Sequence, residues 1–196
     1  AAEIAAAVAE RLSAHIENLR LAEQTQNALA NTEALFAGSE SVVRASSMSE
    51  ILAALVQTTG LQQLDLASLI LFERPWHQNP EAMFLTAHWE KRASTSTLPA
   101  RTVMLVSEFP ALKQVIMHDY FYAKDVESDP RLDENTISVY REFGIKTAFA
   151  IPLAVGDQII GFITASSHQS VPFDDGAIRR ITSLVGQAAV VAQSLR

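Results

Sequence analysis

Apolar and polar residues follow one another along the first part of the chain with the spacing of a coiled coil. The apolar residues recur at intervals of three and four, and His15 and Gln26 fill the two polar positions of this register. No Gly or Pro occurs before Gly38, and good helix formers dominate. The pattern predicts a long entry helix over residues 1–36 whose apolar stripe meets a second copy of the chain. The stripe consists of Ala5, Val8, Leu12, Leu19, Ala22 and Leu29.

Short apolar runs bounded by turn residues follow this helix and predict a sheet. The runs indicate strands over residues 64–72, 83–89, 101–106, 120–126, 147–153 and 159–166, with a hairpin turn at Gly156. Helix-start and helix-stop residues predict helices over 47–60, 107–118 and 129–144. The first of these helices begins with a capping box formed by Ser47 and Glu50, and the last begins at Asp129. This order predicts an α+β fold with a central, mainly antiparallel sheet of about six strands and helices on both faces.

The last segment of the chain carries a second apolar stripe. Asp174 and Asp175 predict a helix start. From there Ile178, Ile181, Val185, Ala188, Ala192 and Leu195 recur at spacings of three and four. We interpret this stripe as another coiled-coil seam. The expected organisation is an entry helix (1–36), a folded domain (37–172) and an exit helix (173–196) that packs with the entry helix and a dimer partner.

Composition and charge narrow the possible functions. The chain has 196 residues, of which 48% are hydrophobic, and a formal net charge of −7. Its basic residues are scattered, so the sequence favours neither nucleic-acid binding nor a membrane-surface role. No apolar run approaches the roughly 20 residues that span a bilayer, and the absence of cysteine fits a cytoplasmic location. Because the chain begins Ala1-Ala2-Glu3, we expect it to be a fragment of a longer protein.

Four segments together resemble the GAF family of signalling modules. They are Asp65–Phe72, Val103–Val126, Asp129–Ile145 and Ala148–Phe162, the last with Ala150-Ile151-Pro152-Leu153, a Gly156-Asp157 turn and Ile160-Gly161-Phe162. The resemblance covers residues 33–196 and implies a sensory domain of a multi-domain regulator such as a sensor histidine kinase. Members that attach a tetrapyrrole covalently or reduce methionine sulfoxide use cysteine, which this chain lacks. The residues that accompany Phe173 also do not match the family's cyclic-nucleotide signature.

The resemblance also implies a ligand pocket. Its candidate lining comprises Leu69, Leu71, Tyr122, Asp125, Tyr140, Thr147, Phe149 and Phe162, among which Tyr122, Asp125, Tyr140 and Thr147 could orient a ligand. The alternative is that these residues simply form the core. Haem stays open as a ligand because His88 and His118 lie near the expected pocket, although a hydrogen-bonded histidine is the plainer interpretation of each. No spacing of histidines indicates a metal site, and no catalytic motif is present, so we expect no enzymatic activity.

Two functions remain open from the sequence. The first is a sensory or signal-relay module that binds a small molecule and forms a homodimer through its terminal helices. The second is a dimerisation spacer that binds no ligand. The presence or absence of a cavity beside the strand that leads to Asp125 distinguishes the two.

Overall fold

The chain consists of two compact units, residues 1–36 and 37–196, in a computed structural model. The structure describes residues 2–92, 102–109 and 112–196, without the side chains of residues 2–10, 27, 31, 113 and 114. The first unit is helical throughout, because the helix α1 runs over Ala2–Val43. Its last turns, beyond Phe36, belong to the second unit. The helix therefore continues beyond the predicted end at residue 36 and through Gly38.

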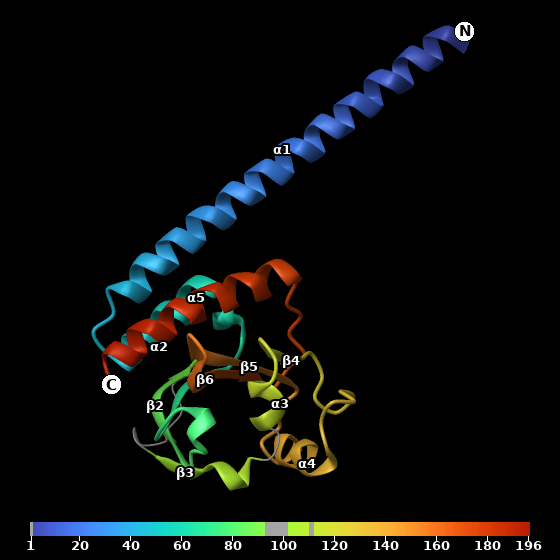
Figure 1. Cartoon of the computed structure of the whole chain (residues 1–196). Coiled ribbons are helices and arrows are strands. Elements are labelled where there is room, and N and C mark those ends of the chain that lie inside the picture. The colour runs from blue at the N-terminus through green and yellow to red at the C-terminus, as the bar shows by residue number, and fades with distance from the viewer. Residues whose placement is uncertain (1, 93–101, 110–111) are drawn as a thin grey trace. The chain divides into compact units, whose positions relative to one another are not determined.

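The second unit is built on one antiparallel sheet of six strands (Figure 1). The strands are β1 (Leu66–Phe72), β2 (Ala82–Glu90), β3 (Val103–Leu105), β4 (Phe121–Ala123), β5 (Thr147–Val155) and β6 (Gln158–Ser167). Their order across the sheet is β3-β2-β1-β6-β5-β4. The predicted α+β fold and the terminal hairpin are confirmed. The strand β4 is shorter than the predicted run over 120–126.

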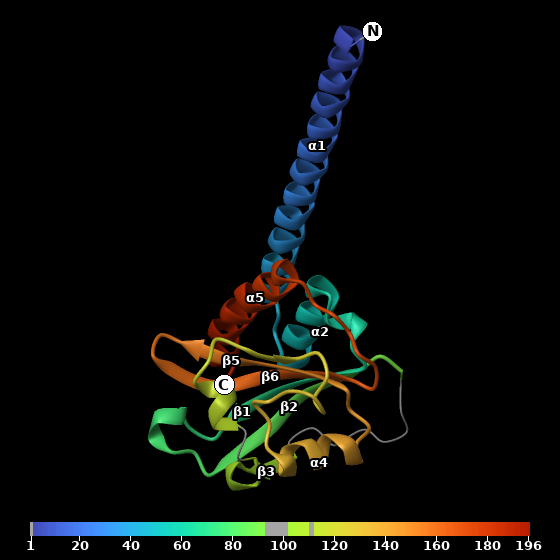
Figure 2. The same ribbon diagram turned by 90° about the vertical axis from the view of Figure 1, so that its right-hand side faces the viewer.

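Helices cover both faces of the sheet (Figures 1 and 2). Helices α2 (Met48–Thr59) and α5 (Asp175–Ser194) lie side by side on one face, and α3 (Leu112–Ile116) and α4 (Glu134–Glu142) lie on the other. Single helical turns occur at Leu61–Gln63, Trp76–Gln78 and Val106–Glu108. The helix predicted after Ser107 is therefore a single turn followed by the short α3, and residues 110–111 between them lie outside the described residues.

The helix starts show which capping predictions were right. Ser47 accepts a hydrogen bond from the amide of Glu50, and Asp174 accepts one from the amide of Ala177, so both predicted caps are confirmed. Helix α4 instead begins at Asp133, whose carboxylate accepts a hydrogen bond from the amide of Thr136. The prediction of a start at Asp129 is wrong, because the Asp129 carboxylate bonds to the backbone and side chain of Arg131.

The C-terminal stripe is not a coiled-coil seam, and that interpretation is wrong. Five of its six residues (Ile178, Ile181, Val185, Ala188 and Ala192) are buried within the chain itself, where α5 packs on α2 and β5. A helix that covers a sheet presents apolar residues at the same spacings of three and four as a coiled coil. The stripe therefore stabilises the domain, and only Leu195, 41% exposed, lies at the surface.

Two glycines allow close packing in this unit. A Cβ on Gly38 would lie 2.6 Å from Cδ1 of Leu184 and 2.9 Å from Oγ1 of Thr58, so the end of α1 lies directly against α5 and α2. A Cβ on Gly161 would collide with the carbonyl oxygen of Ile70 on the paired strand β1. These contacts fix the end of α1 and the centre of the sheet.

The burial of α5 gives a prediction about stability. Val185 is fully buried, so Val185→Asp places an unpaired carboxylate in the core and should lower the free energy of unfolding by about 4 kcal/mol or more. Leu195→Asp should cost no more than about 1 kcal/mol, since that side chain is already partly in water. Urea unfolding followed by circular dichroism checks both variants. Equal and small effects would show that α5 is not part of the core.

Candidate functional site

A cavity of about 340 Å³ lies on the face of the sheet that α3 and α4 cover. Its lining is mostly apolar and comes from the sheet, from α3 and α4, and from the segments beside them. The described lining residues are Ile70, Met83, Met104, Glu108, Phe109, Leu112, Val115, Phe121, Leu132, Asn135, Thr136, Val139, Tyr140, Ile145, Ala148, Phe149, Ala150, Phe162, Thr164, Ala165 and Ser166. This volume is within the range of small-molecule sites.

The alternation of strand residues forms the floor of the cavity. Phe162, Thr164 and Ser166 of β6 share one face because side chains two positions apart point the same way. Thr164 pairs with Ala150 of β5, and Ser166 pairs with Ala148. The two alanines are small, so the sheet leaves space where larger aliphatic residues would have filled the core.

Helix α4 and the preceding loop form a wall of the cavity. Within that loop, the Arg131 guanidinium forms an ion pair with Asp129 at 2.5 Å and lies 4.7 Å above the ring of Phe121. It also donates a hydrogen bond to the carbonyl oxygen of Tyr122 on β4. The side-chain hydrogen bond from Arg131 lowers the pKa of Asp129. These contacts attach the loop to the sheet edge and so position α4.

Three hydroxyl groups border the cavity without a protein partner. The side chains of Tyr140, Thr164 and Ser166 make no hydrogen bond to any residue in the described part of the chain. Burial raises the pKa of the Tyr140 phenol, so this group stays protonated and can donate. Thr164 and Ser166 can each donate and accept. These half-buried hydroxyls are open to the cavity, where a polar atom of a ligand can bond to them.

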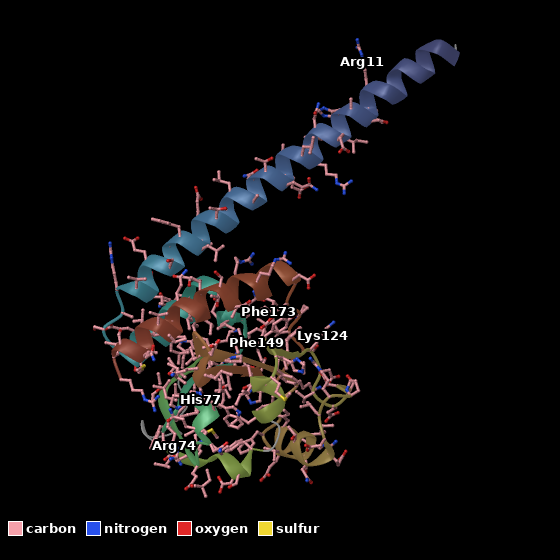
Figure 3. The ribbon with its side chains drawn as sticks, viewed as in Figure 1. Arg11, Arg74, His77, Lys124, Phe149 and Phe173 are labelled. Atoms are coloured by element: carbon pink, nitrogen blue, oxygen red, sulfur yellow. The ribbon has the colours of Figure 1, made fainter. Side chains whose placement is uncertain are left out.

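The structure brings three of the eight predicted site residues to this cavity. Tyr140, Phe149 and Phe162 line it, although the ring of Phe149 packs 5.9 Å from the ring of Phe173 on the α5 side of the sheet (Figure 3). Leu69 and Leu71 are buried but do not line the cavity, because they alternate with Ile70 along β1.

Tyr122, Thr147 and Asp125 also lie away from the cavity. The Tyr122 hydroxyl donates to the carbonyl oxygen of Val171 and accepts from the amide of Phe173. The Thr147 hydroxyl accepts from the amide of Val171 and lies 2.9 Å from the carbonyl oxygens of Lys124 and Gln169. Tyr122 and Thr147 therefore hold the segment that leads into α5. Asp125 is exposed, and its carboxylate accepts a hydrogen bond from the amide of Glu127.

The two histidines considered as haem ligands are not at the cavity. Both ring nitrogens of His88 have partners, Nδ1 at 2.9 Å from the Ser68 hydroxyl and Nε2 at 3.0 Å from the Glu90 carboxylate. His118 is exposed in the turn after α3 and does not line the cavity. The hydrogen-bonded interpretation of His88 is confirmed, and neither side chain is placed to ligate an iron in this cavity.

Three further features of the described residues bear on other kinds of site. No group of three or more His, Asp or Glu side chains in that set is arranged to hold a metal ion. No helix in the described ranges is both long enough and apolar enough to cross a bilayer. A second hollow, of about 700 Å³, lies between β5 and the first half of α5. It is an open surface groove, because much of its lining is exposed, including Asp175, Arg179 and Ser183.

Comparison with known proteins identifies the family. The GAF domain model matches residues 47–192, and the chain belongs to this family. No curated protein sequence gives a significant match. Similar solved structures include the chromophore-binding domain of the bacteriophytochrome RpBphP3 from R. palustris, with a TM-score of 0.66 and 11% identity over 84% of this chain and 60% of that one.

Two further similar structures come from other photoreceptors. The wild-type chromophore-binding domain of Stigmatella aurantiaca phytochrome P1 has a TM-score of 0.64 and 14% identity, over 85% of this chain and 59% of that one. The blue-light-absorbing form of the Thermosynechococcus elongatus PixJ GAF domain has a TM-score of 0.57 and 15% identity, over 75% of this chain and 83% of that one. The chain thus spans about 60% of the phytochrome structures it resembles, and at these identities the likeness shows the fold.

Sequence reasoning missed the hydroxyls and the alanines that shape the cavity. Thr164 and Ser166 alternate with apolar residues in the hairpin strand, on the same face as the predicted Phe162. Ala148 and Ala150 alternate in the same way on β5. The signal was polar or small residues at core-facing positions of a strand, where large aliphatic residues are usual.

The Asp129–Arg131 pair predicts a pH-dependent effect. The pKa of Asp129 is lower in the folded chain than in the unfolded chain, so its carboxylate stabilises the fold at pH values above the unfolded pKa. This stabilisation is lost as the pH falls through the pKa of the folded state. Arg131→Ala should therefore lower the free energy of unfolding by ~1 kcal/mol at neutral pH, and by less below about pH 4. Denaturation across that range measures the difference. Arg141→Ala, which removes exposed ion pairs with Glu127 and Glu134, is the control. A difference that stays constant with pH would contradict this role.

Proposed function

We propose that this GAF domain is a sensory module of a signalling protein, which binds a small molecule in the cavity between the sheet and α4. The observation that carries the proposal is the hollow itself, bordered by three hydroxyls without protein partners. The similar phytochrome structures are chromophore-binding domains, which supports ligand binding by this fold. Since the chain has no cysteine, a ligand would be held here without a thioether bond. We further propose that the domain acts by binding and not by catalysis.

Two contacts, joined through the helix α5, offer a route for the signal from the cavity to the end of α1. Phe149 borders the cavity, and its ring contacts Phe173, which directly precedes the N-cap of α5. Leu184 of α5 in turn packs at Gly38 near the end of α1. A ligand that binds one arrangement of these elements better than another shifts their equilibrium by its differential affinity, typically ~1–3 kcal/mol. We propose that this shift is passed on through α1.

The first unit supports pairing of two chains through α1. Leu12, Leu19 and Leu29 are 59%, 58% and 59% exposed, and they fall on one stripe of the helix. The side chains of Ala5 and Val8, which extend the predicted stripe, lie outside the described ones. A helix with such an uncovered leucine stripe is stabilised when a second helix covers it. Homodimerisation through α1 is therefore part of the proposal, whereas the buried α5 has no apolar stripe left to contribute.

The exposed stripe also favours the second function, a dimerisation spacer without a ligand. The stripe on α1 would pair two chains whether or not the cavity is used. The two functions differ in the role of the hollow face, because a spacer gains nothing from an unfilled space beside unpaired hydroxyls.

A cavity-filling substitution tests whether the hollow exists. Ala150→Leu places a larger side chain into the cavity and should raise the free energy of unfolding by about 0.5–2 kcal/mol. The control is Ala67→Leu, at a fully packed position on the α2/α5 face, which should cost about 1–3 kcal/mol. Chemical denaturation of both variants gives the comparison. If Ala150→Leu destabilises as much as Ala67→Leu, the hollow is filled core and the ligand-binding function fails.

A second test addresses the pairing. Leu19→Lys combined with Leu29→Lys places charges in the proposed seam and should convert a dimer into a monomer at tens of micromolar. Leu21→Lys is the matched control, because Leu21 is 51% exposed but lies off the stripe, and this variant should remain dimeric. Sedimentation velocity distinguishes the species. A monomeric parent chain, or equal behaviour of the two variants, would contradict pairing through this stripe.

A further inference from the structure

The unpaired hydroxyls at the cavity differ from the other buried hydroxyls of the domain. Thr59 bonds to the carbonyl oxygen of Leu55, Ser167 donates to the Asp65 carboxylate, and Tyr122 donates to a carbonyl oxygen on the opposite face of the sheet. Around the cavity, by contrast, Tyr140, Thr164 and Ser166 have no such partner among the described residues. Half-buried hydroxyls that converge on one cavity offer hydrogen bonds to a molecule bound there.

These three groups approach the cavity from two directions. Thr164 and Ser166 lie on β6, on the floor, and Tyr140 lies on α4, in the wall. Ser68, which pairs with Thr164 across the sheet, is already bonded to His88. A ligand between floor and wall could therefore meet two hydroxyls with one polar group and Tyr140 with another. Its remaining surface would face apolar side chains such as Phe162 and Met83.

The charges around the cavity restrict the ligand further. None of the lining residues that the structure describes is Lys, Arg or His, and the one acidic residue in that set, Glu108, is exposed. The neighbouring Arg131 is engaged by Asp129, by a backbone carbonyl oxygen and by the Phe121 ring. From these described residues alone, a buried phosphate or carboxylate would lose its hydration without gaining a cation, which is unfavourable.

We propose that the cavity takes an uncharged, largely apolar small molecule whose carbonyl, amide or hydroxyl groups hydrogen-bond to Tyr140, Thr164 and Ser166. The inference rests on the proposed function and adds the chemical class of the ligand. It separates this domain from sites built for anionic ligands. Tyr140 acts as a donor at neutral pH, because burial keeps its phenol protonated.

Matched pairs of probes test this class directly. The probes are carboxamides and carboxylates on the same phenyl, indolyl and hexyl scaffolds, such as indole-3-acetamide and indole-3-acetate, titrated into the full chain and followed by NMR. The carboxamides should bind at least about tenfold more tightly than the matching carboxylates. Tyr140→Phe and Thr164→Val should each weaken carboxamide binding by about three- to tenfold.

Tyr122→Phe is the matched control, since it removes a hydroxyl that is already bonded on the other face. It should lower the melting temperature without changing carboxamide affinity, whereas Tyr140→Phe should weaken binding without lowering the melting temperature. Tighter binding of the carboxylates, or of the corresponding amines, would overturn the ligand class and leave the sensory function standing. If no member of any pair binds, both the ligand class and the sensory function fail.

Discussion

The alternation of side chains along the central strands is the constraint on which the rest of this structure depends. One face of the sheet carries large apolar residues such as Leu69 and Phe149, and α2 and α5 seal it. The other face also carries buried core around Phe162 and Phe121, but Thr164, Ser166 and two alanines of β5 border a cavity there. Because both faces belong to the same strands, the face that α2 and α5 cover and the proposed binding face are separated by a single layer of backbone.

This separation explains the position of the aromatic and hydroxyl groups. Tyr122 and Thr147 were expected at a ligand but are used to fix the segment before α5. Tyr140 contributes to the hollow face, where its hydroxyl has no partner in the described chain. Phe149 is shared between the faces, since it borders the cavity and packs on Phe173. Phe149 is therefore the residue that connects the cavity side of the sheet to the start of α5.

The sequence predicted the fold better than the site. Caps at Ser47 and Asp174, the hairpin turn and the six strands follow from local patterns that tertiary packing did not override. The stripe on α5 was misassigned because helices on sheets and helices in coiled coils share one spacing. Leu69 and Leu71 were placed on the wrong face, because β1 is an unbroken apolar run that does not show which side chains point to which face. A change of register by one residue exchanges the two faces of a strand.

The most direct test of the central claim is a crystal structure of the chain under xenon pressure, since xenon occupies apolar cavities that are truly empty. We expect xenon between Thr164 of β6 and Tyr140 of α4, and none between the sheet and α5. If α4 instead packs closely against Ala148 and Ala150 and no xenon binds beside it, both faces of the sheet are sealed. That result would contradict the division of the sheet into a stabilising face and a binding face.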